Sequence, residues 1–364
     1  MRVLTVVGNR PQFVKAAAVS GPLRARTEEV LVHTGQHYDD ELSRIFFDEL
    51  GLAGADRELG IGSGTNTEQT SRQLAALEPV IAEVKPDLVL VYGDTNSTLS
   101  GGLAAAQAGV KVAHVEAGMR SFDRTMPEEV NRVLTDHLAD LLLCSSEVAA
   151  QNLEREGVSG RVEVVGDVMV DVALRVQPRA RENLAPLHER GLEPGAFALV
   201  TVHRAGNVDH PGRLARLVEL LLALPVPAVF PLHPRTEARL RTAGLLERLE
   251  EWDGIHLCPP LGYLDFTALL CHARAVLTDS GGVQKEAYLA GVPCVTLRDR
   301  TEWVETVHAG WNVLVDLDPI ALLAALEEPR PDQRPPLYGD GRAGERVAEV
   351  VASLAEWVPG GSPS

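Results

Sequence analysis

The sequence predicts an α/β protein made of two similar, doubly wound domains, each with a parallel β-sheet. The chain has 364 residues, which exceeds the size at which a single hydrophobic core stops growing. Short apolar runs alternate with helical patterns along most of it, as in βαβ units. This pattern occurs twice, on either side of a polar, Arg- and Pro-containing stretch at about 172–194. That stretch is expected to form a helix and a linker.

Each half contains six apolar runs of strand length. The runs of the first half are Val3–Val7, Val30–His33, Leu88–Tyr92, Val110–His114, Leu141–Cys144 and Val162–Val165. The runs of the second half are Phe197–Val202, Ala228–Pro231, Ile255–Cys258, Ala275–Thr278, Cys294–Leu297 and Trp311–Val315. A last amphipathic helix is expected over Arg342–Trp357. Ligands bind at the carboxyl ends of strands in such sheets, so a cleft between the two sets of strand ends is the expected site.

Composition and charge exclude several classes of function. The net charge is −17, from 34 basic and 51 acidic residues, whereas nucleic-acid and membrane-surface binding favour basic patches. An anionic ligand would therefore need a local basic pocket. The four cysteines show no C-x-x-C spacing, so neither a metal site nor a disulfide framework is indicated. The first residues lead into a strand, and no run of about 18 apolar residues occurs. We expect a soluble cytoplasmic protein.

Three acidic residues stand where the predicted elements end or begin. Asp94 and Glu116 follow two expected strands of the first half, and Glu128 opens a helix just after Pro127. Carboxylates from different elements that converge on one crevice are what proton abstraction and return require. Two of these residues also fit structural roles: Asp94 could cap a helix, and Thr125 with Glu128 matches a capping box.

Other residues of the same segment are given structural roles. Glu129, the neighbour of Glu128, is interpreted as a helix-terminus acid. Met119 and Phe122 are expected to be packing residues.

A glycine loop in the second half has the layout of a phosphate site. Ser280, Gly281 and Gly282 follow an expected strand and open a helix, where backbone N–H groups and the helix dipole favour an anion. Glu286, one turn into that helix, is placed to contact a ribose diol. The alternative is a tight strand-to-helix turn with a serine cap.

The first loop of the chain repeats this layout and adds positive charge. Gly8 ends an expected strand, and Arg10 and Lys15 follow at the start of a helix. They supply the local basic charge that an acidic protein needs to hold a diphosphate. A further turn, Gly62-x-Gly64-x-Asn66, is weaker support for a ligand loop. His203 with Arg204, and His233, also follow expected strands, although a histidine there is commonly structural.

Together these segments resemble the non-hydrolysing UDP-N-acetylglucosamine 2-epimerases. The matching segments are GNRPQFVKAA, TGQHYD, VYGDTNST, HVEAGMRS, MPEEVNRVLTDH, TVHR and LTDSGGVQKEA, which cover the chain from Arg2 to about Leu354. The resemblance implies a GT-B fold with two Rossmann-like domains and the nucleotide between them. It places the first domain at residues 1–171, joined by the last helix at about 342–358, and the second domain at residues 172–341. It also suggests a homodimer.

The resemblance also implies a mechanism that uses no cofactor. UDP leaves C1 as the C2 proton leaves, which gives a 2-acetamidoglucal, and UDP re-adds while a proton returns to the opposite face of C2. By their match to the family, Asp94, Glu116 and Glu128 are the acid/base carboxylates, with no assignment of each to one face. His203 is a fourth essential residue near the phosphates. The implied binding residues are Arg10, Lys15, Ser280, Gly281 and Gly282 for the diphosphate, Glu286 for the ribose, Phe266 for the uracil, and Arg132 for support.

Departures from the family pattern leave the substrate open. The run His203-Arg204-Ala205-Gly206-Asn207 lacks an acid that many members carry, and Thr301-Glu302-Trp303-Val304-Glu305 and Gln12 look more like relatives acting on UDP-2,3-diacetamido-glucuronic acid. UDP-N-acetylglucosamine, converted to UDP-N-acetylmannosamine for cell-surface polysaccharide, remains the first expectation. Asp39 stands where members that bind a second UDP-sugar as activator carry Gln. The residues matching that activator site are Gln36, Arg72, Arg204 and His233. A GT-B glycosyltransferase is disfavoured by the three carboxylates.

Overall fold

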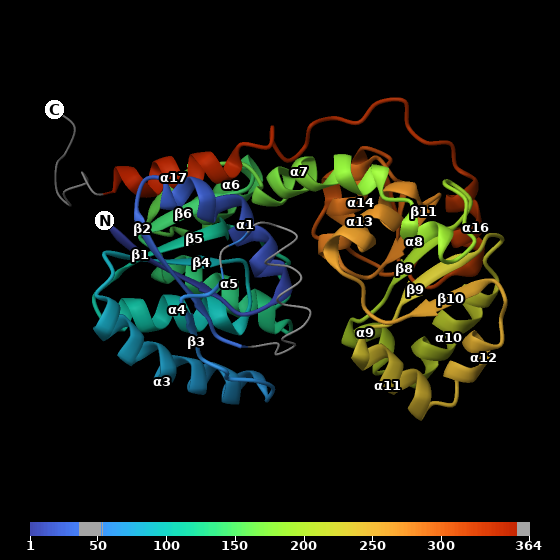
Figure 1. The fold of residues 1–364 in the computed structure, drawn as a ribbon, viewed down its shortest axis with the longest axis horizontal. Helices are drawn as coiled ribbons and strands as arrows, with labels where there is room; N and C mark the ends of the chain where they lie inside the picture. Colours follow the sequence, from blue (N-terminus) through green and yellow to red (C-terminus); the bar gives the residue numbers. More distant parts are fainter. Residues whose placement is uncertain (36–51, 53, 355–364) are drawn as a thin grey trace. The chain divides into compact units, whose positions relative to one another are not determined.

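The computed structural model describes residues 1–35, 52 and 54–354, with only the backbone of Arg10. The chain forms two compact units (Figure 1). Unit 1 contains Met1–Val172 and the chain from Tyr338 onward, and unit 2 contains Ala173–Leu337. The boundaries expected from the sequence were 171/172 and 341/342, a few residues away.

Unit 1 is built on a parallel sheet with strand order β3-β2-β1-β4-β5-β6-β7. Its strands are β1 (Arg2–Val7), β2 (Glu28–His33), β3 (Arg57–Glu58), β4 (Leu88–Tyr92), β5 (Lys111–Ala117), β6 (Leu141–Cys144) and β7 (Arg161–Val164). Its helices are α1 (Arg10–Arg24), α3 (Asn66–Val84), α4 (Asn96–Gln107), α5 (Pro127–Leu138), α6 (Glu147–Glu156) and α17 (Ala343–Ser353). Helices α1 and α17 pack together on the side of the sheet opposite α3 and α4 (Figure 1).

The last helix is part of unit 1 because its backbone is bonded there. The carboxylate of Asp171 accepts hydrogen bonds from the N–H groups of Ala343 (3.0 Å) and Gly344 (2.7 Å). A Cβ on Gly344 would lie 2.1 Å from the carbonyl oxygen of Ala18 on α1, so glycine permits the close approach of the two helices.

Unit 2 contains a second parallel sheet, with strand order β10-β9-β8-β11-β12-β13. Its strands are β8 (Ala198–Thr201), β9 (Ala228–Pro231), β10 (Ile255–Cys258), β11 (Ala275–Thr278), β12 (Cys294–Thr296) and β13 (Asn312–Leu314). Its helices are α8 (Ala185–His188), α9 (Ala205–Val208), α10 (Pro211–Leu222), α11 (Pro234–Thr242), α12 (Leu246–Glu250), α13 (Tyr263–His272), α14 (Gly281–Ala290), α15 (Val304–His308) and α16 (Pro319–Glu327). Alternate strand residues enter two core clusters, as a sheet covered on both faces requires.

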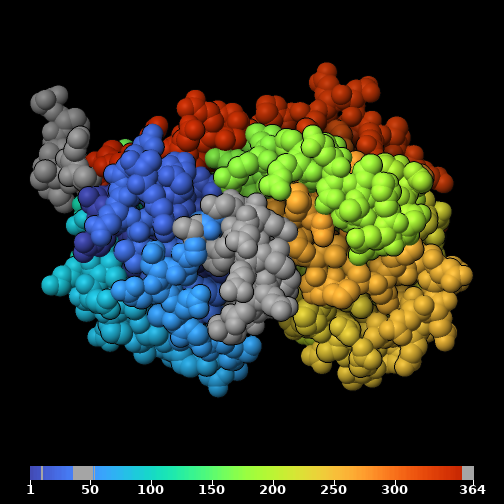
Figure 2. Space-filling model, in the orientation of Figure 1, coloured from blue at the N-terminus to red at the C-terminus, as the bar shows by residue number. Residues whose placement is uncertain are grey.

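Helix α7 (Val168–Glu182) includes the boundary between the units. It runs along the surface (Figure 2) and exposes Leu174, Arg175, Pro178 and Arg179, while the residues between them are buried. This helical period matches the helix expected in the polar stretch.

Every one of the twelve expected strands is present, and the differences are local. The two-residue strand β3 was not expected, because it is too short to show an apolar pattern. Strand β5 continues to Ala117, past the expected end at His114, through a register shift between Val115 and Ala117. Helix α17 ends at Ser353, and Trp357 and the final segment lie outside the described residues. Within the described chain, no helix is both long enough and apolar enough to cross a membrane.

Candidate active site

The ends of β4 and β5 bring Asp94 and Glu116 to neighbouring positions. The two strands are paired with Tyr92 opposite Val115, and the N–H of Gly93 donates to the carbonyl of Val115 at 3.0 Å. Gly93 then turns with φ +65°, and Asp94 follows. Glu116 lies inside β5, at the bulge, with φ +72°. The expectation that Glu116 follows the strand is therefore wrong, because the bulge carries the strand past it.

A lysine from the first loop pairs with Glu116. Lys15 lies on α1, and its Nζ forms an ion pair with Oε2 of Glu116, with the side chains only 13% and 9% exposed. A Cβ on Gly93 would lie 2.9 Å from Lys15 Nζ and 3.5 Å from Glu116 Oε2. Glycine is therefore favoured at position 93 by its φ, and it places the residue before Asp94 against this ion pair.

Helix α5 contributes a second cation. Arg132 forms an ion pair with Asp94 and another, at 3.1 Å, with Glu129 one turn earlier. Asn131 donates to the carbonyl oxygen of Asp94 at 3.0 Å. Glu128 is exposed on the first turn of α5, three and four residues before Asn131 and Arg132, which puts it on the same helix face. The structure thus brings Asp94, Glu116, Lys15 and Arg132 together. Glu128 is included because it lies on the same face of α5 as Arg132.

The capping-box alternative for Glu128 is wrong. Helix α5 is preceded by Met126, which makes no side-chain cap, and the Thr125 hydroxyl instead donates to Asp123 at 2.6 Å. Glu129 lies in the first turn of α5, as expected for a helix-terminus acid, and it also bonds the preceding loop. Glu129 is 2% exposed. It accepts hydrogen bonds from the Ser121 N–H (2.9 Å), the Ser121 hydroxyl (3.0 Å) and the Phe122 N–H (3.0 Å).

These bonds hold an exposed aromatic residue in a strained conformation. Phe122 is 74% exposed and has φ +57°, a region that residues with a Cβ rarely adopt. The expectation that Phe122 is a packing residue is therefore wrong. Its loop is anchored through Glu129 and Arg132 to Asp94.

In unit 2, the adjacent strands β9, β8 and β11 bring three polar segments together. The His203 and His233 rings lie 5.5 Å apart, and Arg204 follows His203. The buried Asp279 accepts hydrogen bonds from the N–H groups of His203 (3.1 Å) and Arg204 (3.0 Å), and its carboxylate lies 3.8 Å from His203 Nδ1. Loss of surrounding water, with Arg204 and Arg235 nearby, lowers the pKa of His203 despite the charge of Asp279.

The glycine loop of unit 2 opens helix α14 as expected. Ser280 precedes the helix in a short strand-to-helix turn, as the alternative expects, but its side chain makes no cap hydrogen bond, so that part of the alternative is wrong. The Ser280 N–H donates to the Thr278 hydroxyl at 2.9 Å. A Cβ on Gly281 would lie 3.0 Å from Trp303 Nε1, whereas one on Gly282 would meet only Ser280 Oγ, at 3.9 Å.

Two further expected binding residues lie on α13 and α14. Burial raises the pKa of Glu286 to about 7, with Lys285 and a hydrogen bond to Tyr263 opposing the shift. The side chain is nonetheless partly accessible to solvent. Phe266 is partly buried and packs against the core cluster beneath α13.

The residues expected for an activator site are only partly described. Gln36 and Asp39 lie outside the described residues, as does the Arg10 side chain. Arg72 on α3 donates to the carbonyl oxygens of Ile61 (2.8 Å) and Ser63 (2.7 Å) and so holds the 61–63 turn. Arg204 lies 3.7 Å from Glu302. No group of His, Cys, Asp and Glu suited to a metal ion occurs in residues 1–35, 52 and 54–354.

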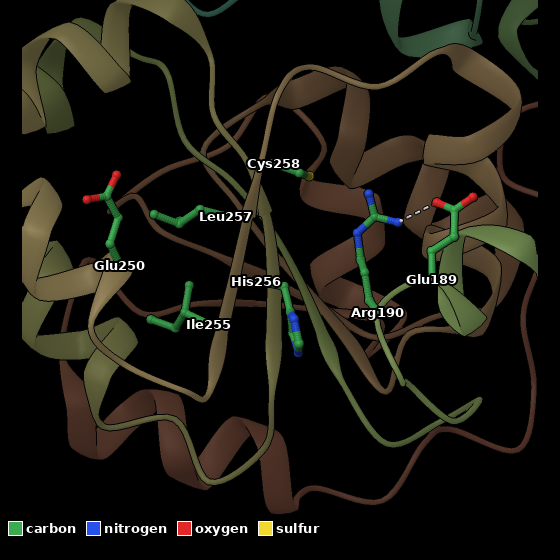
Figure 3. Close-up of a pocket in the computed structure, with 7 residues that line it drawn as sticks. All are labelled: Glu189, Arg190, Glu250, Ile255, His256, Leu257 and Cys258. Atoms are coloured by element: carbon green, nitrogen blue, oxygen red, sulfur yellow. Dashed lines mark ion pairs between the residues drawn. The ribbon is translucent and has the colours of Figure 1, made fainter.

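A hollow in unit 2 lies away from these residues, at the edge strand β10 (Figure 3). It is bordered by Ile255, His256, Leu257 and Cys258, with Glu250 on one side and the ion pair of Arg190 with Glu189 (3.5 Å) on the other. None of the expected site residues lines it.

Sequence reasoning missed several residues that shape the site. Asp279 lies in the segment LTDSGGVQKEA, between an expected strand and Ser280. This position could have identified it as a site residue. Glu129 and Asn131 flank expected site residues on α5. His114 and Asp136 are buried and 22 positions apart, and no local pattern links them.

The comparisons with known proteins agree over nearly the whole chain. A family model described as UDP-N-acetylglucosamine 2-epimerase matches residues 23–352. A Pseudomonas aeruginosa protein named UDP-2,3-diacetamido-2,3-dideoxy-D-glucuronate 2-epimerase is 46% identical, covering 97% of this chain and 100% of that protein. A Methanococcus maripaludis protein named UDP-N-acetylglucosamine 2-epimerase homolog is 45% identical, with the same coverage.

Solved structures give the same result. The Methanocaldococcus jannaschii UDP-GlcNAc 2-epimerase, solved in complex with UDP-GlcNAc and UDP, superposes with a TM-score of 0.90 at 40% identity, covering 96% of this chain and 99% of that one. A Polygonum tinctorium UDP-glucosyltransferase, at 14% identity and a TM-score of 0.56 over 97% of this chain and 94% of that one, shares the fold alone. The α/β fold with two Rossmann-like domains is as expected, and the chain belongs to the UDP-N-acetylglucosamine 2-epimerase family.

Proposed function

We propose that this protein is a non-hydrolysing epimerase that inverts C2 of UDP-N-acetylglucosamine to give UDP-N-acetylmannosamine. The observation that carries the proposal is the pair of carboxylates Asp94 and Glu116 at adjacent strand ends, each with its own cation, Arg132 and Lys15. The C2 proton of an N-acetylhexosamine is not acidic, because no carbonyl is bonded to C2. A fixed base and a route for the leaving UDP are therefore both needed.

The reaction balances without any cofactor. A carboxylate removes the proton from C2, the C2 electron pair forms the C1=C2 bond, and the C1–O bond breaks with its electrons on the β-phosphate of UDP. An oxygen of the β-phosphate then re-adds to C1, and a protonated group delivers a proton to the opposite face of C2. Asp94, Glu116 and Glu128 are the proposed proton carriers. We leave their order on the two faces to experiment.

Unit 2 is proposed to hold UDP. The N-terminus of α14, with Ser280, Gly281 and Gly282, offers backbone N–H groups and the positive end of a helix dipole to a phosphate. His203 would donate a hydrogen bond toward the diphosphate as charge develops on the leaving group. Glu286 would accept from the ribose, Phe266 would contact the uracil, and Arg10 would reach the phosphates. Lys15 would stabilise the leaving diphosphate while its partner Glu116 takes part in proton transfer.

UDP-2,3-diacetamido-glucuronate is the second candidate substrate. It is favoured by the sequence Thr301-Glu302-Trp303-Val304-Glu305 and by the 46% identical Pseudomonas aeruginosa relative. Both substrates undergo the same chemistry at C2. The enzyme is assayed with each of the two UDP-sugars at equal concentrations. The preferred substrate is the one with the higher kcat/KM.

We also propose that the protein is a homodimer and that it is located in the cytoplasm. Val130 and Leu134, one turn apart on α5, are 41% and 46% exposed and form an apolar strip suited to a partner subunit. Sedimentation of Leu134→Glu tests this assignment, since a charge in such a strip favours the monomer.

The reaction itself is tested in heavy water. The enzyme is incubated with UDP-N-acetylglucosamine, and the products are analysed by NMR. We expect a mixture of the two UDP-sugars with deuterium at C2.

Asp94→Asn and Glu116→Gln should each lower kcat about 10²–10⁴-fold. Release of free N-acetylmannosamine and UDP would identify a hydrolase instead, and epimerisation without deuterium at C2 would exclude the elimination mechanism.

A further inference from the structure

A buried polar cluster that the proposed chemistry does not use lies behind Asp94 and Glu116. Its centre is His114 on β5, two residues before Glu116 and fully buried. Nδ1 of His114 lies 2.7 Å from Oδ1 of Asp136 on α5, and Nε2 lies 2.7 Å from the carbonyl oxygen of Gly93. One imidazole ring thus connects helix α5 to the residue that precedes Asp94.

The second carboxylate oxygen of Asp136 continues the cluster on the other side of Glu116. Oδ2 accepts from the N–H of Gly118 at 3.1 Å and from the Arg120 guanidinium at 2.7 Å. His114 and Gly118 stand two residues before and two residues after Glu116. The single carboxylate of Asp136 therefore bonds the His114 side chain on one side of Glu116 and the Gly118 backbone on the other.

Arg120 pairs with two carboxylates of the cluster. Burial opposes the charge of Asp136, but His114 and Arg120 outweigh burial and hold its pKa below the ordinary value. A carbonyl oxygen only accepts, so Nε2 of His114 carries a hydrogen. The positive charge of Arg120 faces the negative charges of Asp136 and Glu156, which pairs with Arg120 at 2.7 Å. Such a fully bonded cluster is rigid.

Rigidity is needed here because Glu116 is held in an unfavourable conformation. Its φ of +72° is disfavoured for a residue with a Cβ, and it lies at the bulge of β5. Conformations of this kind persist only where the surroundings impose them. The bonds of Asp136 to His114 and Gly118, with the Gly93–Val115 backbone bond, are the surroundings that impose it.

We propose that His114 and Asp136 are positioning residues, which hold Asp94 and Glu116 at the separation and orientation that proton transfer at C2 requires. The proposal rests on the proposed epimerase function. Neither residue needs to touch the substrate. Their effect passes through Gly93 to Asp94 and through the bulge to Glu116.

The test is a comparison of Asp136→Ala, Asp136→Asn and His114→Leu with the wild-type enzyme, using kcat, KM and UDP affinity. A displacement of a catalytic group by about 1 Å lowers the rate on the order of 10²-fold. We therefore expect Asp136→Ala and His114→Leu to lower kcat about 10²-fold, with KM and the UDP dissociation constant changed less than about threefold. Asp136→Asn should recover most of kcat, because its amide can donate to a neutral His114 and its oxygen can accept from Gly118 and Arg120.

A stability control separates positioning from folding. Asp171→Ala removes another carboxylate of unit 1, which bonds two backbone N–H groups of α17 far along the chain from Asp94 and Glu116. This variant should lower the melting temperature but leave kcat per folded enzyme unchanged. If Asp136→Ala does not fold, His114→Leu carries the test, because it leaves Asp136 with Gly118 and Arg120 as donors.

The outcomes are distinct. Wild-type kcat per folded molecule in both His114→Leu and Asp136→Ala would overturn the positioning role while leaving the proposed function intact. So would a loss in Asp136→Asn as large as that in Asp136→Ala. A wild-type enzyme that epimerises neither UDP-sugar would overturn the proposed function, and the positioning role with it.

Discussion

Arg132 on α5 forms an ion pair with Asp94 at the end of β4, joining residues 38 positions apart. The same guanidinium binds Glu129, which holds the loop that carries Phe122. The helix after the β5 loop therefore supplies both the cation beside one carboxylate and the support for an exposed loop. Of the two acids at the start of α5, Glu129 thus supports this loop, whereas Glu128 is exposed.

Glu129→Gln should mainly lower the stability of the protein, whereas Glu128→Gln should mainly lower its turnover. Glu129 is buried against Arg132, so Glu129→Gln leaves that arginine with fewer anionic partners and should lower the free energy of unfolding by about 3 kcal/mol. Glu128 is exposed, so Glu128→Gln should change it by less than about 0.5 kcal/mol. Turnover should fall about 10²–10⁴-fold in Glu128→Gln. Urea unfolding and epimerisation assays measure both, and full turnover in Glu128→Gln would remove it from the proposed proton carriers.

Phe122→Gly should stabilise the protein. The wild-type residue has φ +57°, which costs about 1–2 kcal/mol for a residue with a Cβ, and its exposed ring buries little surface. Glycine has more freedom in the unfolded chain, which offsets part of this gain. The net increase in the free energy of unfolding should therefore be about 0.5–1 kcal/mol. Phe122→Ala, which keeps the Cβ, is the matched control and should not stabilise. A less stable Phe122→Gly would show that the ring makes contacts of greater value than the strain.

Glu286→Gln should change how stability depends on pH. Burial raises the folded-state pKa of Glu286 from 4.5 to about 7. The folded protein therefore binds an extra proton between these values, and wild-type stability falls as the pH rises through this window. The glutamine variant lacks this penalty, so its advantage should grow from pH 4.5 to 7 and reach about 1–3 kcal/mol after solvent screening. Chemical unfolding of the UDP-free protein at a series of pH values measures it.

Glu302→Gln is the control of opposite sign. Arg298 and Arg204 outweigh burial and hold the pKa of Glu302 below its ordinary value. Its ionised form therefore stabilises the folded protein above pH 4.5, and that stability is lost as the pH falls through the folded-state pKa. Glu302→Gln should be less stable than wild type at neutral pH, with the difference vanishing in acid. A parallel pH dependence of the two variants would contradict both assignments.

Two glycines of the first βα segment should respond differently to alanine. A Cβ on Gly8 would lie 1.9 Å from Ser97 Oγ and 2.5 Å from Thr34 Oγ1, so Gly8→Ala should lower the free energy of unfolding by about 1–3 kcal/mol. Gly21 lies inside α1 with no atom within 4 Å of such a Cβ, and Gly21→Ala should raise it by up to about 1 kcal/mol. Thermal unfolding measures both. If Gly8→Ala leaves the free energy of unfolding unchanged, the first loop accommodates the added Cβ without loss of stability.

Local sequence patterns determined the fold class because apolar strand runs and helical periods are short-range features. All twelve expected strands formed, and the glycine loop of unit 2 opened a helix as expected. Family motifs added the candidate residues. The two-residue strand β3 escaped notice, since two exposed residues carry no periodic signal.

Only the tertiary structure decided which charges meet. The sequence did not indicate that Lys15 pairs with Glu116, 101 positions away, or that Glu129 in the first turn of α5 bonds the loop that carries Phe122. It also placed Glu116 after a strand, whereas a bulge keeps it inside β5 at φ +72°. Ion pairs and backbone strain depend on contacts between distant segments, which no local pattern encodes. The sequence by itself thus determined the strands, the loops and the candidate carboxylates, and the packing of β4, β5 and α5 determined the partners that surround Asp94 and Glu116.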